Sequence, residues 1–276
     1  MGQLDGKVAI VTGAARGQGR SHALALAAEG ARVVACDIAA QIESVEFPMS
    51  TPDELQETVR MITASGGDAL AVTTDIRSTE QVQALTDRAV EDYGSVDILV
   101  ANAAICGTGP LEQLTDAQWD DMIDVNLTGT FKCLRAVLPH MKRTGYGRVV
   151  VTSSMTGRHG NANLSHYSAS KFGVIGMVKS AALEVATMGI TVNAMCPTSA
   201  NTPMLHNDTN YRLFCPDVDN PTIDDVRPRF ASLNPMELPW LEPEAYTRAV
   251  MFLVTDPGHI SGATLEVGAG VSAQLA

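Results

Sequence analysis

Seven short apolar runs, rich in valine, isoleucine and alanine, recur along the chain and alternate with segments of helical character. Apolar runs of this length are typical of strands that are covered on both faces of a parallel sheet. Because strands that alternate with helices need right-handed crossovers, the pattern predicts an α/β fold: a doubly wound, Rossmann-like parallel sheet of about seven strands with helices on both faces. The expected strands are residues 7–12, 32–36, 69–74, 96–101, 148–152, 191–195 and 264–267.

Helix-start signals lie between these runs. Thr51 is followed by a proline and, three positions on, by an acidic residue, as at a capped helix start. Ser78 with Gln81, and Thr115 with Gln118, repeat the spacing of a capping box. The expected helices cover residues 20–29, begin near 51 and 78, and cover 115–141 and 167–188.

Two segments interrupt the alternation. Residues 38–50 separate the second strand from its helix by more than the usual ~2 to 6 residues, and we interpret them as an insertion. Residues 198–243 contain repeated prolines and are too broken for a long helix, so we interpret them as a substrate lid of short helical turns. Without a repeat or linker, residues 1–276 are expected to form a single dinucleotide-binding and catalytic domain.

Charge and composition exclude several classes of protein. The net charge is −12 and no stretch collects lysine and arginine, so nucleic-acid binding is not expected. No run of residues is apolar for long enough to span a membrane and no signal peptide is visible, which predicts a cytoplasmic protein. The cysteines and histidines do not have the spacing of metal ligands, so no metal site is expected.

A glycine-rich turn joins the first strand to the first helix. Glycine suits a tight turn, a close approach of the backbone to a pyrophosphate, and close packing of helix on strand. The start of the helix would offer free N–H groups to the phosphates. A tight turn without a ligand is the alternative, but the strand-to-helix position favours a dinucleotide site. The expected cofactor-binding residues in the turn are Gly13, Arg16, Gly17, Gln18 and Gly19.

Asp37 ends the second strand, and its position bears on the choice between NAD and NADP. A carboxylate there accepts hydrogen bonds from the ribose hydroxyls and repels a 2′-phosphate. Two observations compete: Arg16 could hold a 2′-phosphate, and Asp37 could merely cap the next segment. We predict NAD, with NADP less favoured, because Asp37 would lie closer to the phosphate.

Tyr167 and Lys171 lie four residues apart, on one face of an expected helix. Oxidation of an alcohol needs a base, and a phenol with a pKa of about 10 is poorly matched to neutral pH. A neighbouring ammonium would lower that pKa by favouring the phenolate. Ser154, just after an expected strand, could hold the substrate oxygen, and Asn126 could support a proton-carrying water. Taken singly, each could instead be a core ring, a solvated charge or a helix cap.

Together these features resemble the short-chain dehydrogenase/reductase family, from about residue 6 to residue 270. The resemblance implies an NAD-dependent alcohol dehydrogenase or ketone reductase with Tyr167 as general acid/base and Lys171 also on the nicotinamide ribose. It implies catalytic residues and further cofactor contacts at matching positions. The catalytic set is Asn126, Ser154, Tyr167 and Lys171. The further cofactor contacts are Ile38, Asp75, Ile76, Asn102, Ala103, Ala104, Pro197, Ala200 and Thr202.

A narrower resemblance is to the carveol-dehydrogenase-like, or mycofactocin-coupled, group. It is carried by residues 38–50 and 51–59, by Asp75-Ile76-Arg77, and by residues 196–204. The resemblance implies tightly bound NAD, a separate redox carrier and a homotetramer. Because residues 38–50 follow Asp37, they could form a flap over the NAD; the alternative is a surface loop.

The lid is rich in apolar side chains and poor in basic ones, which favours an uncharged hydrophobic secondary alcohol or ketone, such as a terpenoid like carveol. The same side chains could instead pack the lid or form a subunit contact. Alternatives are an NADPH-dependent 3-oxoacyl carrier-protein reductase, a sugar-nucleotide epimerase and a non-catalytic NAD-sensing protein. The candidate substrate contacts are Met155, His159, Met204, Leu205, Phe214 and Trp240.

Overall fold

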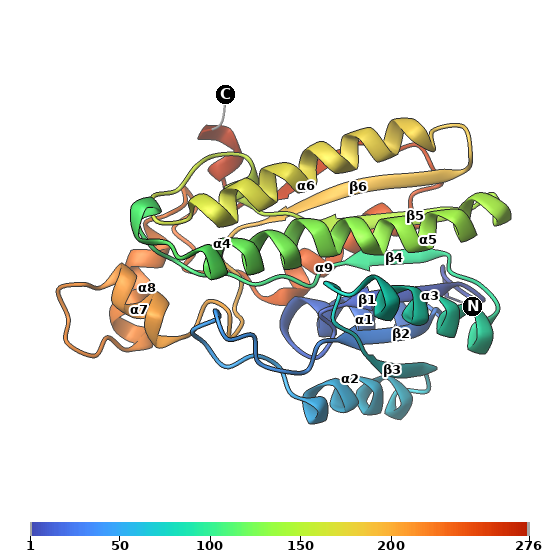
Figure 1. Cartoon of the computed structure of the whole chain (residues 1–276), viewed down its shortest axis with the longest axis horizontal. Helices are drawn as coiled ribbons and strands as arrows, with labels where there is room; N and C mark the ends of the chain where they lie inside the picture. The colour runs from blue at the N-terminus through green and yellow to red at the C-terminus, as the bar shows by residue number, and fades with distance from the viewer. Residues whose placement is uncertain (1, 275–276) are drawn as a thin grey trace.

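A computed structural model describes residues 2–274 and shows a seven-stranded parallel sheet (Figure 1). The strand order is β3-β2-β1-β4-β5-β6-β7, so the direction of winding reverses between β1 and β4. This arrangement confirms the predicted doubly wound α/β fold. The strands are β1 (Val8–Thr12), β2 (Arg32–Asp37), β3 (Ala69–Thr73), β4 (Ile98–Ala101), β5 (Gly147–Thr152), β6 (Ile190–Pro197) and β7 (Thr264–Val267).

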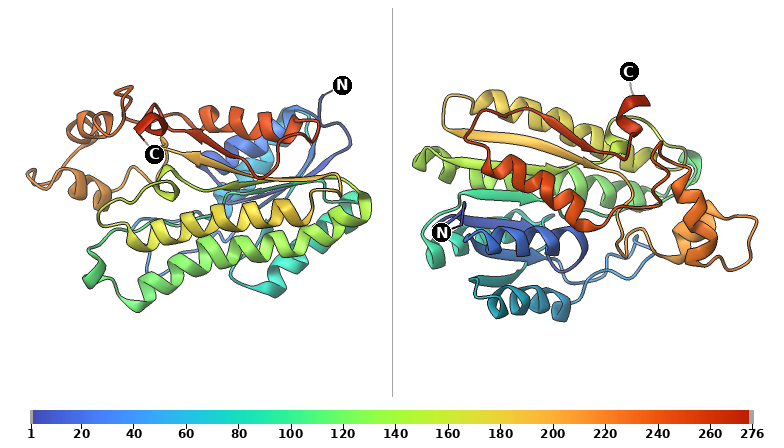
Figure 2. Two further views of the ribbon diagram at one scale, coloured as in Figure 1. Left: turned by 90° about the horizontal axis from the view of Figure 1, so that it is seen from above. Right: turned by 180° about the vertical axis from the view of Figure 1, so that it is seen from behind.

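Helices cover both faces of the sheet, as the two views of Figure 2 show. One face packs against α1, α2 and α9, and the other against α3, α5 and α6. Across residues 2–274, no helix combines the length and apolar character needed to cross a membrane. The helices are α1 (Gly17–Ala28), α2 (Pro52–Ala64), α3 (Thr79–Tyr93), α4 (Asp116–Ile123), α5 (Thr130–Thr144), α6 (Ser165–Glu184), α7 (Asp208–Phe214), α8 (Ile223–Ala231) and α9 (Pro243–Thr255).

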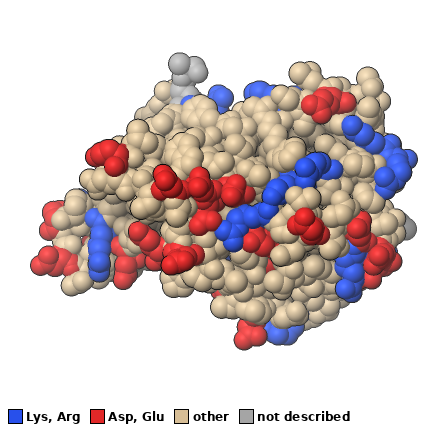
Figure 3. Space-filling view, in the orientation of Figure 1, with Lys and Arg blue, Asp and Glu red and all other residues tan. Residues whose placement is uncertain are grey.

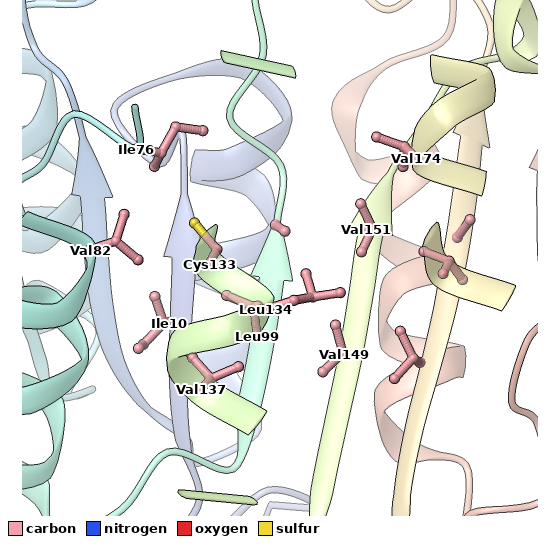
Figure 4. Close-up of a cluster of buried hydrophobic side chains, with 14 of the residues drawn as sticks. Ile10, Ile76, Val82, Leu99, Cys133, Leu134, Val137, Val149, Val151 and Val174 are labelled. Atoms are coloured by element: carbon pink, nitrogen blue, oxygen red, sulfur yellow. The ribbon is translucent and has the colours of Figure 1, made fainter. Parts of the chain in front are cut away.

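The core divides into two layers because successive strand residues point to opposite faces. In β1, Ile10 belongs to the layer under α5, while Val11 belongs to the layer under α1 and α9. Figure 4 shows Ile10, Leu99 and Val149 of the sheet beside Leu134 of α5. All of these side chains are at most 3% exposed, so the central strands are fixed from both faces.

The expected helix starts are present, and one expected helix is wrong. Capping boxes join Thr51 to Glu54 and Thr115 to Gln118, and the Ser78 hydroxyl accepts from the amide of Gln81. The expected single helix over residues 115–141 is instead α4, a six-residue π-helical segment (Asp124–Gly129) and α5. The π segment contains Asn126, whose side chain bonds the backbone of Ile105, a tertiary contact that capping patterns do not report.

Residues 198–243, which the sequence predicts to form a lid, have a small core of their own. Ala200 pairs with Leu241 where the two ends of the lid meet, and α7 and α8 lie between these residues. The buried side chains of this core are Cys215, Val226 and Phe230. This segment therefore forms a compact unit of short helices after the carboxyl end of β6.

Candidate active site

A cavity lies beyond the carboxyl ends of β1 and β4, where the winding of the sheet reverses. Ligands of doubly wound folds bind at this position. The structure brings most of the predicted cofactor residues to this cavity. They are Gly13, Arg16, Gly17, Gln18, Asp37, Ile38, Asp75, Ile76, Asn102, Ala103, Ala104, Tyr167, Lys171, Pro197 and Thr202.

Two predicted cofactor residues lie outside the lining. Gly19 is buried behind the turn: a Cβ there would be 2.0 Å from the carbonyl oxygen of Gly13 and 2.8 Å from Nδ2 of Asn102. Gly19 therefore lets α1 pack closely on the turn, and it is not a lining residue. Ala200 is 8% exposed, forms a bridge with Leu241 and lies outside the lining, so its contact with the cofactor stays a prediction.

The start of α1 fits the diphosphate of a dinucleotide. Arg16, at the N-cap, makes no capping hydrogen bond with its side chain, and Gly17 and Gln18 line the cavity. Within residues 2–274, Oε1 of Gln18 is buried without a hydrogen-bond partner. Gly13 has a φ of +67°, and a Cβ there would lie 2.8 Å from Cα of Ala103. Glycines therefore leave the backbone at the start of α1 without side chains, at the point where an anion would approach the helix N-terminus.

The Asp37 carboxylate is held in place by three donors. Its Oδ2 accepts from the amide of Ala15 at 3.1 Å. Its Oδ1 accepts from the amide of Ala39 at 3.1 Å and from the Ser50 hydroxyl at 2.5 Å. One position on Oδ2 is left for a ligand hydroxyl.

The Arg16 guanidinium contacts Pro48 and Glu54. Its Nη2 donates to the carbonyl oxygen of Pro48 at 2.5 Å, and its Nη1 lies 3.6 Å from Oε1 of Glu54. The guanidinium charge therefore already faces a carboxylate.

Residues 38–50, the segment predicted as a possible flap, form one wall of the cavity. Gln41 shapes it: Nε2 donates to the carbonyl oxygens of Ile42 (3.0 Å) and Val45 (2.8 Å), and Oε1 accepts from the amide of Met49 (3.1 Å). Sequence reasoning placed the flap near the adenosine but missed the individual residues, whose only signal was the length of the insertion after Asp37. They are Ile42, Phe47, Met49 and Ser50.

Other lining residues were missed although they adjoin predicted ones. Most lie at or just beyond the carboxyl ends of strands, and that position was the available signal. They are Cys36, Thr74, Ile105, Val125, Thr152, Ser153 and Pro203.

Tyr167 and Lys171 both line the cavity from the start of α6. Lys171 is 2% exposed, its Nζ donates to the carbonyl oxygen of Thr152 at 2.9 Å, and it lies 5.6 Å from the centre of the Tyr167 ring. Burial lowers the pKa of Lys171 to about 8, because the charged form loses solvent. The side chain is a buried cation that points toward the ring of the tyrosine.

Burial also raises the pKa of Tyr167 well above its ordinary value, and the nearby Ser154 hydroxyl acts in the opposite direction. We expected Lys171 to lower the pKa of Tyr167, but in the structure the opposite effect of burial is larger. The physical reason is that the phenolate loses solvent inside the cavity, which outweighs the neighbouring polar groups. Tyr167 therefore keeps its proton at neutral pH.

Ser154 and Asn126 hold backbone around the pair. The Ser154 hydroxyl accepts from the amide of Thr156 at 3.1 Å, just past the end of β5. Asn126 is 1% exposed, and its Oδ1 accepts from the amide of Ile105 (2.8 Å) while its Nδ2 donates to the carbonyl oxygen of Ile105 (2.9 Å). Asn126 thus fixes both backbone polar groups of Ile105, a residue that lines the cavity.

Of the six candidate substrate contacts, one lines this cavity and the other five lie outside its lining. Met204 lines the cavity. Met155 is 4% exposed in the core under α6, and His159 bonds the neighbouring Gly160 carbonyl away from the cavity. Leu205, Phe214 and Trp240 pack in the small core of the lid, because aromatic side chains that are close in the lid bury one another.

Residues 7–212 match the family model described as short chain dehydrogenase. The chain is 41% identical over 275 residues to (-)-trans-carveol dehydrogenase of Rhodococcus erythropolis, covering 99% of each chain. It is 38% identical over 269 residues to cis-4-hydroxycyclohexanecarboxylate dehydrogenase of Sinomonas cyclohexanicum, covering 97% of each.

A solved structure shares the whole fold. Carveol dehydrogenase from Mycobacterium avium in complex with NAD is 40% identical, with a TM-score of 0.96 over 99% of this chain and 100% of that one.

Proposed function

The chain belongs to the short-chain dehydrogenase family of oxidoreductases, and on that premise we propose that it transfers a hydride between NAD(H) and a hydrophobic secondary alcohol or its ketone. The observation that carries this proposal is that Tyr167 and Lys171 line the same cavity as the glycine turn and Asp37. Related proteins named for cyclic alcohols, one of them solved with NAD, support the choice of cofactor and a terpenoid-like or other cyclic substrate.

The cofactor would extend from the flap to Tyr167. Gly13, Gly17 and Gln18 would hold the diphosphate at the start of α1, and Asp37 would accept from the adenosine ribose. Lys171 would also bind the nicotinamide ribose. When bound, NAD would accept or supply the hydride.

NAD is proposed rather than NADP because of the charges at the end of β2. Asp37 is fixed and 8% exposed, so a 2′-phosphate beside it would face a buried negative charge. Arg16, which could have held that phosphate, is paired with Glu54 and the carbonyl oxygen of Pro48.

Replacing Asp37 with alanine is expected to shift the ratio of kcat/KM for NADP over NAD upward by about tenfold or more, since it removes the repulsion and a ribose partner. Steady-state rates with each cofactor at low concentration measure this ratio. Asp53→Ala, an exposed acid at the start of α2, is the matched control and should leave the ratio unchanged. An unchanged preference in Asp37→Ala, or a wild-type preference for NADP, would remove the basis for choosing NAD.

Tyr167 is proposed to act as the general acid/base. Because it keeps its proton at neutral pH, it is ready to donate to the oxygen of a ketone. In the reverse direction its own proton would first leave through the water beside Asn126, and the resulting phenolate would accept the proton of the alcohol. The Lys171 cation lessens the cost of the phenolate that is left behind. Ser154 would hold the substrate oxygen beside the phenol, and Asn126 would support a water through which the proton leaves.

The position of residues 38–50 and the family resemblance support proposals about the redox partner and the oligomeric state. A wall made of residues 38–50 over the cofactor would slow the release of NAD. Electrons would then pass from the bound cofactor to a separate redox carrier. Phe131 on α5 and Phe172 on α6 are 44% and 48% exposed, as expected if these helices form a contact in a homotetramer. The bound substrate would lie near Met204.

A panel of cyclic and acyclic secondary alcohols and ketones tests the proposed reaction. The purified protein is assayed with added NAD(H), with NADP(H), and with an artificial electron acceptor. We expect turnover of uncharged cyclic substrates with NAD or with the acceptor. Reduction of a 3-oxoacyl carrier-protein thioester with NADPH alone, or NAD binding without turnover of any substrate, would contradict the proposal.

A further inference from the structure

Asp121 of α4 joins two segments that border the cofactor cavity. Its Oδ2 accepts from the hydroxyl of Ser44 in the flap at 2.7 Å. Its Oδ1 accepts from Nη1 of Arg77 at 2.7 Å. These contacts span 77 and 44 residues of sequence, so Asp121 is a tertiary junction between the flap, the turn after β3 and the helix α4.

The other side of Arg77 holds the cavity wall. Its Nε and Nη2 donate to Oδ2 of Asp75 at 3.0 and 2.9 Å, and the amide of Arg77 donates to Oδ1 of Asp75 at 2.9 Å. Asp75 and Ile76 line the cavity. The carbonyl oxygen of Arg77 accepts from Lys132 of α5. A chain of polar and charged contacts therefore runs from Ser44 through Asp121 and Arg77 to Asp75 in the cavity wall.

The charges around this junction favour the pairing. Figure 3 shows acidic side chains gathered over α4 and a band of basic side chains beside them over α5. Asp116, Asp120 and Asp124 are the other acids of this region, and Arg77 and Lys132 are the cations that face Asp121. Because Arg77 offsets its negative charge, the Asp121 carboxylate can stay on this acidic helix at modest electrostatic cost. It can then accept a hydrogen bond from the neutral Ser44 hydroxyl.

We propose that Asp121 is a positioning residue that latches the flap over the cofactor site through Ser44, and so slows the release of the dinucleotide. The proposal rests on the proposed function, because it concerns the NAD that the cavity is expected to bind. Ser50 and Pro48 attach the end of the flap nearest Asp37, whereas Ser44 attaches its middle to a different layer of the fold. Opening the flap must break the bond at Ser44 before the cavity wall can move.

The test measures how fast NADH leaves the protein. Wild type, Asp121→Ala, Ser44→Ala and the double variant are loaded with NADH, and its fluorescence is followed after a chase with excess NAD. We expect the dissociation rate to rise about five- to tenfold in Asp121→Ala, since the bonds are charge-assisted but partly exposed. Ser44→Ala should show a smaller rise, and the double variant should be no faster than Asp121→Ala, because both changes remove the same link.

Asp120→Ala, an exposed acid on the same helix, is the matched control and should release NADH like wild type. A latch also predicts an unchanged substrate KM at saturating NAD and little change in melting temperature, whereas a merely structural role would lower the melting temperature. The latch is overturned if Asp121→Ala and wild type release NADH at the same rate, if the control is equally fast, or if the single effects multiply. If wild type binds no NADH, the proposed function and the latch both fail.

Discussion

Replacing Tyr167 with phenylalanine is expected to lower turnover by about 10²- to 10⁴-fold in both directions, the usual contribution of a positioned acid or base. The substitution removes the hydroxyl and keeps the ring that lines the cavity, so NADH binding should stay close to that of wild type. Turnover is measured with saturating cofactor, and NADH affinity by fluorescence titration.

Tyr93→Phe is a suitable control, since Tyr93 bonds Asp68 at the end of α3, away from the cavity. It should retain full turnover. If Tyr167→Phe kept turnover within about tenfold of wild type, another group would be the proton donor. If it lost NADH binding as well, the variant would report a damaged cavity, and the acid/base role would be unsupported.

Replacing Lys171 with methionine is expected to stabilise the fold at neutral pH and to lower turnover by about 10²-fold or more. Burial lowers the pKa of Lys171 from 10.5 to about 8, so the folded protein holds this proton less tightly than the unfolded chain. The cost of burying the cation is fully present below pH 8 and disappears as the pH rises toward 10.5. Allowing for the lost bond to Thr152, the gain in unfolding free energy is on the order of 2 kcal/mol.

Urea unfolding at pH 7 and at pH 10 measures this effect. The stability difference between Lys171→Met and wild type should shrink at the higher pH. Lys179→Met changes an exposed lysine of the same helix and should alter neither stability nor turnover appreciably. A variant that is less stable than wild type at pH 7, or one that keeps its activity, would show that the buried cation does not have the proposed role.

Much of the fold followed from local patterns in the sequence. β-branched runs marked the strands, and the capping boxes at Thr51 and Thr115 marked helix starts. The glycine turn and Asp37 could be placed at one cavity because parallel strands share a carboxyl edge. The π-helical segment around Asn126 was not foreseen, and it accompanies a bond to Ile105, which lies 21 residues away in the sequence.

The substrate end of the cavity was the least predictable part. Phe214 and Trp240 are apolar residues of the lid, but the sequence does not say whether they face a ligand or one another, and they pack in the lid core. Met155 follows Ser154 directly yet points into the main core. The raised pKa of Tyr167 was also missed, because loss of solvent depends on the completed cavity and not on the Tyr-Lys spacing.

Ketone reduction by the NADH-loaded protein, followed in a single turnover across pH, tests the pairing of Tyr167 with Lys171 most directly. Burial leaves the pKa of Lys171 at about 8 and that of Tyr167 above its ordinary value. We expect a wild-type rate constant that is level up to about pH 7 and falls as Lys171 loses its proton, and a low, level rate constant in Lys171→Met. A wild-type rate constant that stays level to about pH 10, or the same fall in Lys171→Met, would contradict this mechanism.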